Sequence, residues 1–218
     1  MLAKRFLIIL LITGLVQSAV AQYRYGLSAG VNFSSLTGKD FSATDFPKIG
    51  ITAGFFYEYE FKQHFSLFFE PMFEQKGASY NYNPKTGIDV YVDNRLNYMT
   101  LPVMVKIPFG GKVSYYFTSG LSLSYLADYT SEVHAYIGDI EIPNESYFPY
   151  TYKKFDAGVS LGLGFNWKEV FLDFRYIHGL RRIYDAEKDA PDIRNHIVSV
   201  KLAFSLYRKK YLPCYKKL

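Results

Sequence analysis

The sequence lacks several features that define common protein classes. Cys214 is its one cysteine, so no internal disulfide can form and a disulfide-stapled exported domain is excluded. After the N-terminus, no run of about 18 apolar residues occurs, which excludes a polytopic helical membrane protein. Charged residues make up 21%, and there is a single tryptophan, but tyrosine and phenylalanine number 21 and 19. That aromatic content excludes intrinsic disorder and a coiled coil, and its location in the fold has to be explained.

Residues 1–21 have the three parts of a secretory signal peptide. Lys4 and Arg5 form the basic region, an apolar stretch follows, and Ala19 and Ala21 are the small residues before the cleavage site. The apolar stretch is too short for a transmembrane anchor, and no stop-transfer flank follows it. We therefore expect an exported protein.

Cleavage is expected before Gln22, which leaves a barrel domain at 22–207 and a basic periplasmic tail at 208–218. The formal net charge is +5, and loss of Lys4 and Arg5 would reduce it to +3. The tail alone carries more positive charge than this remaining excess. The basic composition therefore does not indicate nucleic-acid binding, and export argues against a nucleic-acid partner.

The mature chain is dominated by alternation with period two, which is typical of a strand with two different faces. In residues 23–34, tyrosine, leucine, alanine, valine and phenylalanine share one face, and arginine, glycine, serine and asparagine share the other. No helical period competes outside the N-terminal segment. Eight strands are expected, at 23–34, 49–60, 64–80, 96–109, 112–127, 154–166, 169–182 and 195–207.

The connections between these segments alternate in length. The short ones are 61–63, 110–111 and 167–168, and the long ones are 35–48, 81–95, 128–153 and 183–194. Short turns force antiparallel neighbours, so short and long connections must lie at opposite ends of the sheet. Short periplasmic turns and long outer loops are typical of outer-membrane barrels. The predicted fold is all-β, an eight-stranded antiparallel up-and-down transmembrane β-barrel.

A soluble barrel such as a lipocalin is the main structural alternative. Its polar face would contact water and would be rich in lysine and glutamate. Here the polar face is mostly glycine, serine, threonine and asparagine, which suit the crowded interior of a narrow barrel. Aromatic residues flank the apolar part of the strands, as Tyr23, Tyr25 and Phe33 do in the first one, and resemble membrane-interface girdles. The pattern favours the bacterial outer membrane, with its lipid as a partner.

A small set of charged residues has the inward parity. Buried charges must be paired or solvated, and because both signs are present we expect a network of salt bridges and hydrogen bonds. Phe68 and Met72 share this parity, which favours a filled lumen over an open pore. Arg24 and Glu60, near strand ends, are interpreted as solvated. The predicted members of the lumenal polar network are Glu70, Glu74, Lys106, Asp173, Arg175 and Lys201.

Three motifs resemble the Bacteroidetes outer-membrane β-barrel family that is often called PorT-like. Residues 96–106, LNYMTLPVMVK, resemble the family's L-N-Y-L-E-I-P-L-L-L-K, and residues 175–183 resemble its R-Y-x-x-G-L-x-x-I. Residues 26–34 are similar to its G-x-x-x-G-x-N-x-S. The resemblance implies an eight-stranded barrel in a Gram-negative organism and, through PorT itself, a link to type IX secretion, but no single activity. Thr100 stands where that family usually has glutamate.

No catalytic, cofactor or metal site is predicted. His64, His134, His178 and His196 fall at a turn, in a long loop, on the lipid-facing parity and at a strand start. None has a serine or aspartate partner at a useful spacing. Residues 185–189 have the acid spacing of a calcium loop but lack its glycine and its closing glutamate. We therefore expect neither an enzyme nor a cofactor.

The expected function is structural or a surface interaction, with the lumen plugged by side chains. The loops 35–48, 81–95 and 128–153 carry several aromatic residues, among them Tyr91 and Tyr152, which suit contacts with an extracellular protein or glycan. The alternatives are a small-solute porin and an accessory component of a type IX-like secretion system.

Overall fold

The computed structural model describes residues 22–38, 46–61, 65–82, 89–110, 114–137, 140–142, 152–184 and 193–209. The predicted signal peptide lies outside these residues, including Ala19 and Ala21 at its cleavage site. The predicted tail after Lys209 and residues 39–45 also lie outside them. No helix long and apolar enough to span a membrane occurs in the described part.

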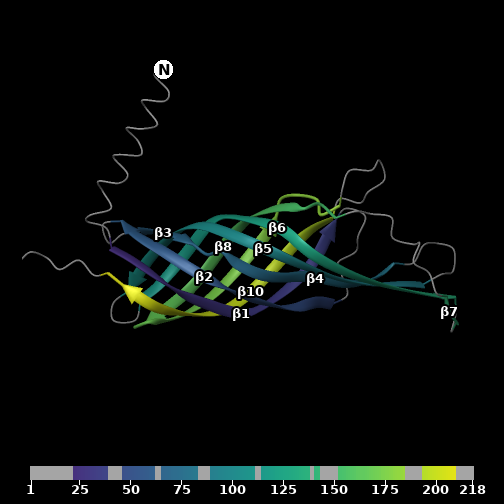
Figure 1. The fold of residues 1–218 in the computed structure, drawn as a ribbon, viewed down its shortest axis with the longest axis horizontal. Helices are drawn as coiled ribbons and strands as arrows, with labels where there is room; N and C mark the ends of the chain where they lie inside the picture. Colours follow the sequence, from purple (N-terminus) through teal and green to yellow (C-terminus); the bar gives the residue numbers. More distant parts are fainter. Residues whose placement is uncertain are drawn as a thin grey trace, which may run out of the picture.

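The described residues form one antiparallel sheet that closes on itself (Figure 1). Its strands are β1 (Gln22–Gly38), β2 (Phe46–Phe61), β3 (Phe65–Phe69), β4 (Met72–Tyr82), β5 (Asp89–Gly110), β6 (Ser114–Ile137), β7 (Ile140–Ile142), β8 (Phe155–Trp167), β9 (Val170–Gly179) and β10 (Ile193–Arg208). β3 and β4 together occupy one position in the ring, and β7 pairs only with the outer end of β6. The ring therefore has eight strands. The predicted fold class is confirmed.

Pairing between the first and last strands closes the barrel. β1 and β10 pair along almost their whole length, from Arg24 opposite Arg208 to Gly38 opposite Ile193. Each other strand pairs with its neighbours in chain order, as an up-and-down barrel requires. The end with the short turns, where β1 begins and β10 ends, is the predicted periplasmic end, and the opposite end is the outer end (left and right in Figure 1).

The strand predicted at 64–80 is interrupted at Glu70 and Pro71. Proline has no backbone N–H to donate to a ladder, so Pro71 removes one hydrogen bond at this point. The other backbone groups of Glu70 and Pro71 still bond to the adjacent strands. Phe55 N of β2 donates to Pro71 O at 3.0 Å, and Glu70 N donates to Pro102 O of β5 at 3.2 Å. The sheet therefore stays continuous around the interruption.

Several strands extend further at the outer end than predicted. The predicted loop 81–95 is wrong in part, because β4 reaches Tyr82 and β5 begins at Asp89. Likewise, β6 continues to Ile137, well inside the predicted loop 128–153. In β6, residues 127–132 are exposed on both faces and their sequence, ADYTSE, does not alternate, so the sequence pattern weakens before the hydrogen-bonded ladder ends. At the other end, Arg208 belongs to β10 and not to the tail.

The two faces of the barrel differ as the alternation predicts. Apolar side chains such as Leu27, Leu121 and Leu202 point outward and are more than half exposed in the isolated chain. Their inward neighbours are small or polar, as Ser28 and Ser122 are. The aromatic residues at the periplasmic end of the outer face form contacting pairs: Tyr23 with Tyr207, Tyr25 with Tyr207, Phe61 with Phe65, and Phe109 with Tyr115.

An arginine on the outer face tests whether this face contacts lipid. We expect Leu121→Arg, in the middle of β6, to lower the free energy of unfolding by about 2–4 kcal/mol, because a cation would enter hydrocarbon. Leu206→Arg is the matched control: both leucines are 55% exposed, but Leu206 lies two residues from the end of β10. It should cost about 0–1 kcal/mol. Urea titration of the protein folded in lipid vesicles measures both values, and equal costs would contradict a lipid-facing surface.

Candidate functional site

The lumen contains three clusters of buried, oppositely charged side chains. The periplasmic cluster consists of Arg24, Glu58 and Lys106; the central cluster of Glu70, Asp173, Arg175 and Lys201; and the outer cluster of Glu74, Lys76 and Asp156. All ten residues are at most 7% exposed. Their formal charges add to +1, zero and −1 in that order, so the three clusters are neutral together.

Glu70 organises the central cluster. Its Oε2 accepts hydrogen bonds from Arg175 Nη1 at 2.6 Å and from Lys201 Nζ at 2.5 Å, and Ser28 Oγ donates to Oε1 at 2.7 Å. Arg175 Nη2 also lies 3.0 Å from Asp173 Oδ1. Charge-assisted hydrogen bonds of this kind are the strong ones, and two cations meet two carboxylates here. The cluster joins the interruption between β3 and β4 to β9 and β10 across the lumen.

Lys76 organises the outer cluster. Its ammonium lies 3.4 Å from Glu74 Oε2 and 3.7 Å from Asp156 Oδ2, and it donates to Ser124 Oγ at 2.9 Å. It also lies 4.5 Å from the centre of the Tyr98 ring, within the range of a cation–π contact.

Thr100 belongs to the surroundings of the outer cluster. Its hydroxyl donates to Glu74 Oε2 at 3.1 Å and lies 2.9 Å from Ser124 Oγ. A glutamate here would add a carboxylate to a cluster that already carries one excess negative charge, and like charges repel. The neutral hydroxyl therefore fits this set of partners.

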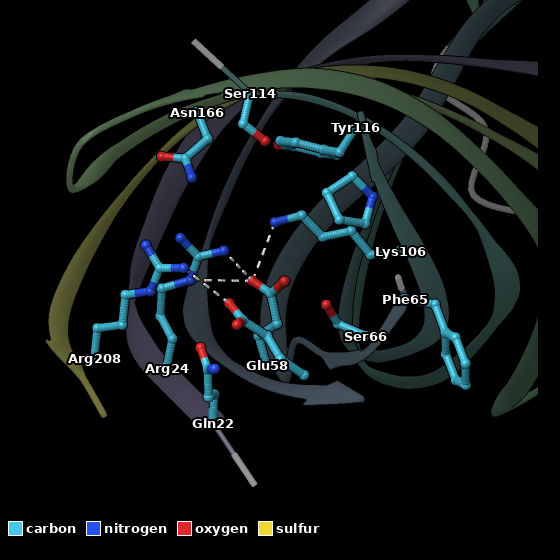
Figure 2. A pocket seen from close by; sticks show the side chains of 12 residues that line it. Gln22, Arg24, Glu58, Phe65, Ser66, Lys106, Ser114, Tyr116, Asn166 and Arg208 are labelled. Atoms are coloured by element: carbon cyan, nitrogen blue, oxygen red, sulfur yellow. Dashed lines mark hydrogen bonds and ion pairs between the residues drawn. The ribbon is translucent and has the colours of Figure 1, made fainter. Parts of the chain in front are cut away.

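The periplasmic cluster converges on one carboxylate oxygen (Figure 2). Glu58 Oε2 accepts from Arg24 Nη2 at 2.6 Å, from Arg24 Nε at 3.2 Å and from Lys106 Nζ at 3.1 Å. The cations also face aromatic rings: Arg24 lies 4.2 Å from the centre of Phe171, and Lys106 lies 4.0 Å from that of Tyr116. Aromatic faces stabilise cations that have few acceptors, because their π-electrons present negative potential.

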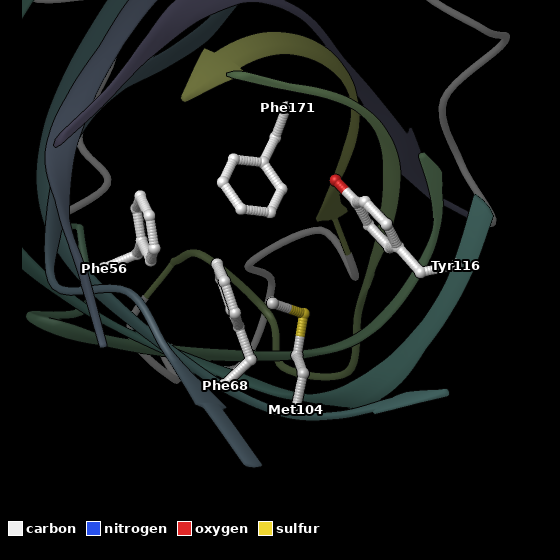
Figure 3. Close-up of a cluster of buried hydrophobic side chains, with 5 residues drawn as sticks. All are labelled: Phe56, Phe68, Met104, Tyr116 and Phe171. Atoms are coloured by element: carbon white, nitrogen blue, oxygen red, sulfur yellow. The ribbon is translucent and has the colours of Figure 1, made fainter. Parts of the chain in front are cut away.

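An aromatic plug lies between the periplasmic and central clusters. Figure 3 shows its side chains. Its members are Phe56, Phe68, Met104, Tyr116 and Phe171. Phe56 and Phe68 stack with centroids 5.5 Å apart, and Phe56 meets the edge of Phe171 at 5.5 Å. The cavity between these rings and the central cluster holds about 10 Å³, which is room for about one water molecule.

Gly26 of β1 provides the space that Phe56 occupies. A β-carbon at this position would lie 1.9 Å from the backbone oxygen of Phe204 on β10 and 2.7 Å from Phe56 Cε1. Glycine is therefore required both by the close approach of β10 and by the Phe56 ring of the plug.

Residues 17–185 match a family described as "Outer membrane protein beta-barrel domain". The chain belongs to this family. Together with the closed eight-stranded ring, this places the barrel in the bacterial outer membrane. A search among curated protein sequences found no match.

Solved outer-membrane barrels resemble the chain over most of its length. Ail of Yersinia pestis, crystallised with sucrose octasulfate, is 14% identical, covers 85% of this chain and 98% of its own, and gives a TM-score of 0.45. Neisserial surface protein A is 13% identical, and the match covers 84% of this chain and 97% of that protein with a TM-score of 0.40. OprG of Pseudomonas aeruginosa is 11% identical, and the match covers 86% of this chain and 95% of that protein with a TM-score of 0.36. At these identities and TM-scores, ligands do not carry over to this chain.

The six residues predicted for the polar network are all buried in the lumen of the barrel, but in three separate clusters. Glu70, Asp173, Arg175 and Lys201 are together, whereas Glu74 lies in the outer cluster and Lys106 in the periplasmic cluster. The interpretation of Arg24 as solvated is wrong, since it is 3% exposed and paired. Glu58, Lys76 and Asp156 were not among the predicted members, although their inward parity was a signal for them.

Two histidines of the barrel lie outside the lumen. His178 and His196 face each other across β9 and β10 on the outer face, with ring centroids 4.6 Å apart. Tyr176 OH lies 2.9 Å from His196 Nδ1 and 3.4 Å from His178 Nδ1. Within the described ranges, no group of three or more histidine, cysteine, aspartate or glutamate side chains could hold a metal ion.

Removal of the Glu70 carboxylate tests the contribution of the central cluster. We expect Glu70→Leu to lower the free energy of unfolding by about 3–5 kcal/mol, because it leaves two buried cations with one carboxylate. The control is Glu60→Gln, which breaks the rim pair with Arg208 at 3.3 Å and should cost about 0–1 kcal/mol. Urea titrations of both variants in vesicles give the comparison. A cost for Glu70→Leu no larger than that of the control would show that the cluster contributes nothing.

Proposed function

We propose that this barrel acts through its outer end, as a structural and surface-interaction protein that contacts an extracellular protein or glycan. The proposal is non-enzymatic and rests mainly on one observation: the β5–β6 ladder continues past the ring at the outer end (Figure 1). It runs from Asn97 opposite Asp128 to Asp89 opposite Tyr136, whereas β8 joins β6 only at Tyr125. On its two edges, β4 pairs with β5 as far as Tyr82 opposite Val90, and β7 pairs with the end of β6. A projecting ribbon offers more contact surface than a short loop.

The projecting ribbon carries aromatic residues suited to contacts. Tyr91 and Tyr129 are 40% and 50% exposed. At its base, Tyr152 packs against Tyr129 at 4.9 Å and against Tyr184 at 5.1 Å between ring centroids. Tyrosine is enriched at protein interfaces because it combines a large rigid ring with a hydrogen-bonding hydroxyl. Burial at the base raises the pKa of Tyr152 to about 12, so this hydroxyl remains a donor at physiological pH.

The filled lumen supports an interaction role over the porin alternative. The aromatic plug and the central cluster leave a cavity of about 10 Å³ between them. A solute larger than water would have to displace Phe56, Phe171 or the bonded Glu70 side chain. We therefore propose a barrel that does not conduct solutes.

A secretion-system accessory of the PorT-like type is the second candidate function. Its support is the three motifs, which lie on β1, on β5 and on β9 with the residues that follow it. We also propose that residues 1–21 are removed on export. Cleavage before Gln22 would leave β1 whole, because Gln22 is its first residue and pairs with Glu60.

Planar-bilayer recording tests the filled lumen. We expect the purified protein to give no resolved single-channel steps, because the rings of the plug block the ionic path. As a matched comparison, the double variant Phe56→Ala/Phe171→Ala should conduct measurably more than the wild-type protein. Well-resolved channels from the wild-type protein would contradict the proposal and favour the porin alternative.

Substitution on the ribbon tests the surface interaction. Cells that display the protein are assayed against a panel of immobilised glycans and extracellular proteins. We expect Tyr129→Ser to reduce wild-type binding severalfold, because it removes an exposed ring from the projecting part of β6. The control is Tyr115→Ser on the same strand, which is 51% exposed but lies at the periplasmic end and should bind as the wild type does. Equal binding by all three proteins would contradict a role for the ribbon.

A further inference from the structure

The periplasmic end of the barrel contains a pocket that the surface-interaction role does not use (Figure 2). Its volume is about 270 Å³, and the aromatic plug separates it from the rest of the lumen. This is far above the roughly 10–15 Å³ that a single water needs, so the pocket has room for several waters or for one small metabolite. We call it the vestibule.

The vestibule carries an excess of positive charge. Its lining includes three cations, Arg24, Lys106 and Arg208, and two carboxylates, Glu58 and Glu60. Arg208 and Glu60 pair at the rim, 3.3 Å apart, and neutralise each other. The excess charge therefore belongs to Arg24 and Lys106, which lie deeper and share the single carboxylate of Glu58.

These two cations have more donors than the protein has acceptors for them. Lys106 is 3% exposed, and its ammonium has three N–H groups but one bonded carboxylate oxygen. That same oxygen also accepts both bonds from Arg24, whose Nη1 has no partner. Buried cations are stabilised by paired anions, and the aromatic rings beside them compensate only in part.

Neutral polar groups lie on the opposite wall. Figure 2 shows the side chains of Asn166 and Ser114 across the pocket from Glu58, with the Lys106 ammonium between the two walls. An amide and a hydroxyl can both donate to an anion held beside a lysine. The lining therefore combines an excess charge with additional donors on the facing side.

We propose that the vestibule binds a small oxyanion, a phosphate or a carboxylate group, presented from the periplasm. The anion accepts hydrogen bonds from Lys106 and from the polar side chains of the facing wall, and it compensates the excess positive charge of the pocket. The pocket is shallow because the plug forms its floor, so the ligand binds and leaves on the same side of the membrane.

Isothermal titration calorimetry of the purified, detergent-folded protein at low ionic strength tests the site. Sodium phosphate is the probe in one arm and sodium succinate in the other. We expect binding that weakens when sodium chloride is added, because salt screens the charges. Lys106→Met should weaken it by about tenfold or more, through loss of a charge-assisted hydrogen bond. Glu58→Gln should strengthen it, because the charge of the vestibule rises to +2.

Lys76→Met is the matched control, since it removes the same side chain from the outer cluster and should leave the affinity unchanged. A heat-modifiable gel shift establishes that each variant is folded. Binding in the phosphate arm, the succinate arm or both supports the proposal and assigns the oxyanion. Three results would overturn it: no heat in either arm with the folded wild-type protein, an unchanged affinity in Lys106→Met, or an equal loss in Lys76→Met.

Discussion

Closure of the sheet by the pairing of β1 with β10 is the constraint on which the rest of the structure depends. Hydrocarbon offers no hydrogen-bond partners, so a sheet can cross a membrane only when its backbone groups pair around a complete ring. Eight strands make the smallest common ring, and its interior holds side chains and little else. Closure therefore decides what the inward positions can be: glycine and serine where the walls are close, and larger side chains only where they interlock. The contact between Gly26 and Phe56 shows both solutions on neighbouring strands.

The same narrowness explains the distribution of charge in the lumen. The central cluster lies next to a cavity with room for about one water, so solvent cannot compensate an unpaired charge there, and its two cations and two carboxylates balance. The unbalanced clusters lie on either side of it. The excess positive charge of the periplasmic cluster borders the vestibule, where water or an anion can reach it. The excess negative charge lies in the outer cluster, on the side where the strands extend toward the cell exterior.

The sequence predicted the faces of the strands better than the partners of the side chains. Period-two alternation identified the inward parity, and this alone selected Glu70, Lys106 and Arg175. Which charges meet depends on strand tilt and on reach across the lumen: Lys201 and Glu70 are 131 positions apart and bond directly. Arg24 was misinterpreted because its position near a strand end does not reveal the width of the pocket. Nor does it reveal that the Phe171 ring lies against the guanidinium. The ribbon at the outer end was missed for a different reason, since residues 127–132 of its β6 strand are exposed on both faces and do not alternate.

The filled lumen and the projecting ribbon support each other physically. A small sheet without a hydrophobic face is marginal in water when isolated, because it has too little apolar surface to offset its loss of conformational entropy. Here the β5–β6 ladder is already formed inside the barrel, from Gly110 opposite Ser114 to Tyr98 opposite Leu126, and it continues past a bulge at Asn97. Each outer pair therefore adds to an existing ladder and needs no nucleation of its own. A rigid, internally bonded barrel keeps that base fixed, so a ribbon with no core of its own can present Tyr91 and Tyr129 in a defined arrangement at the outer end of the barrel.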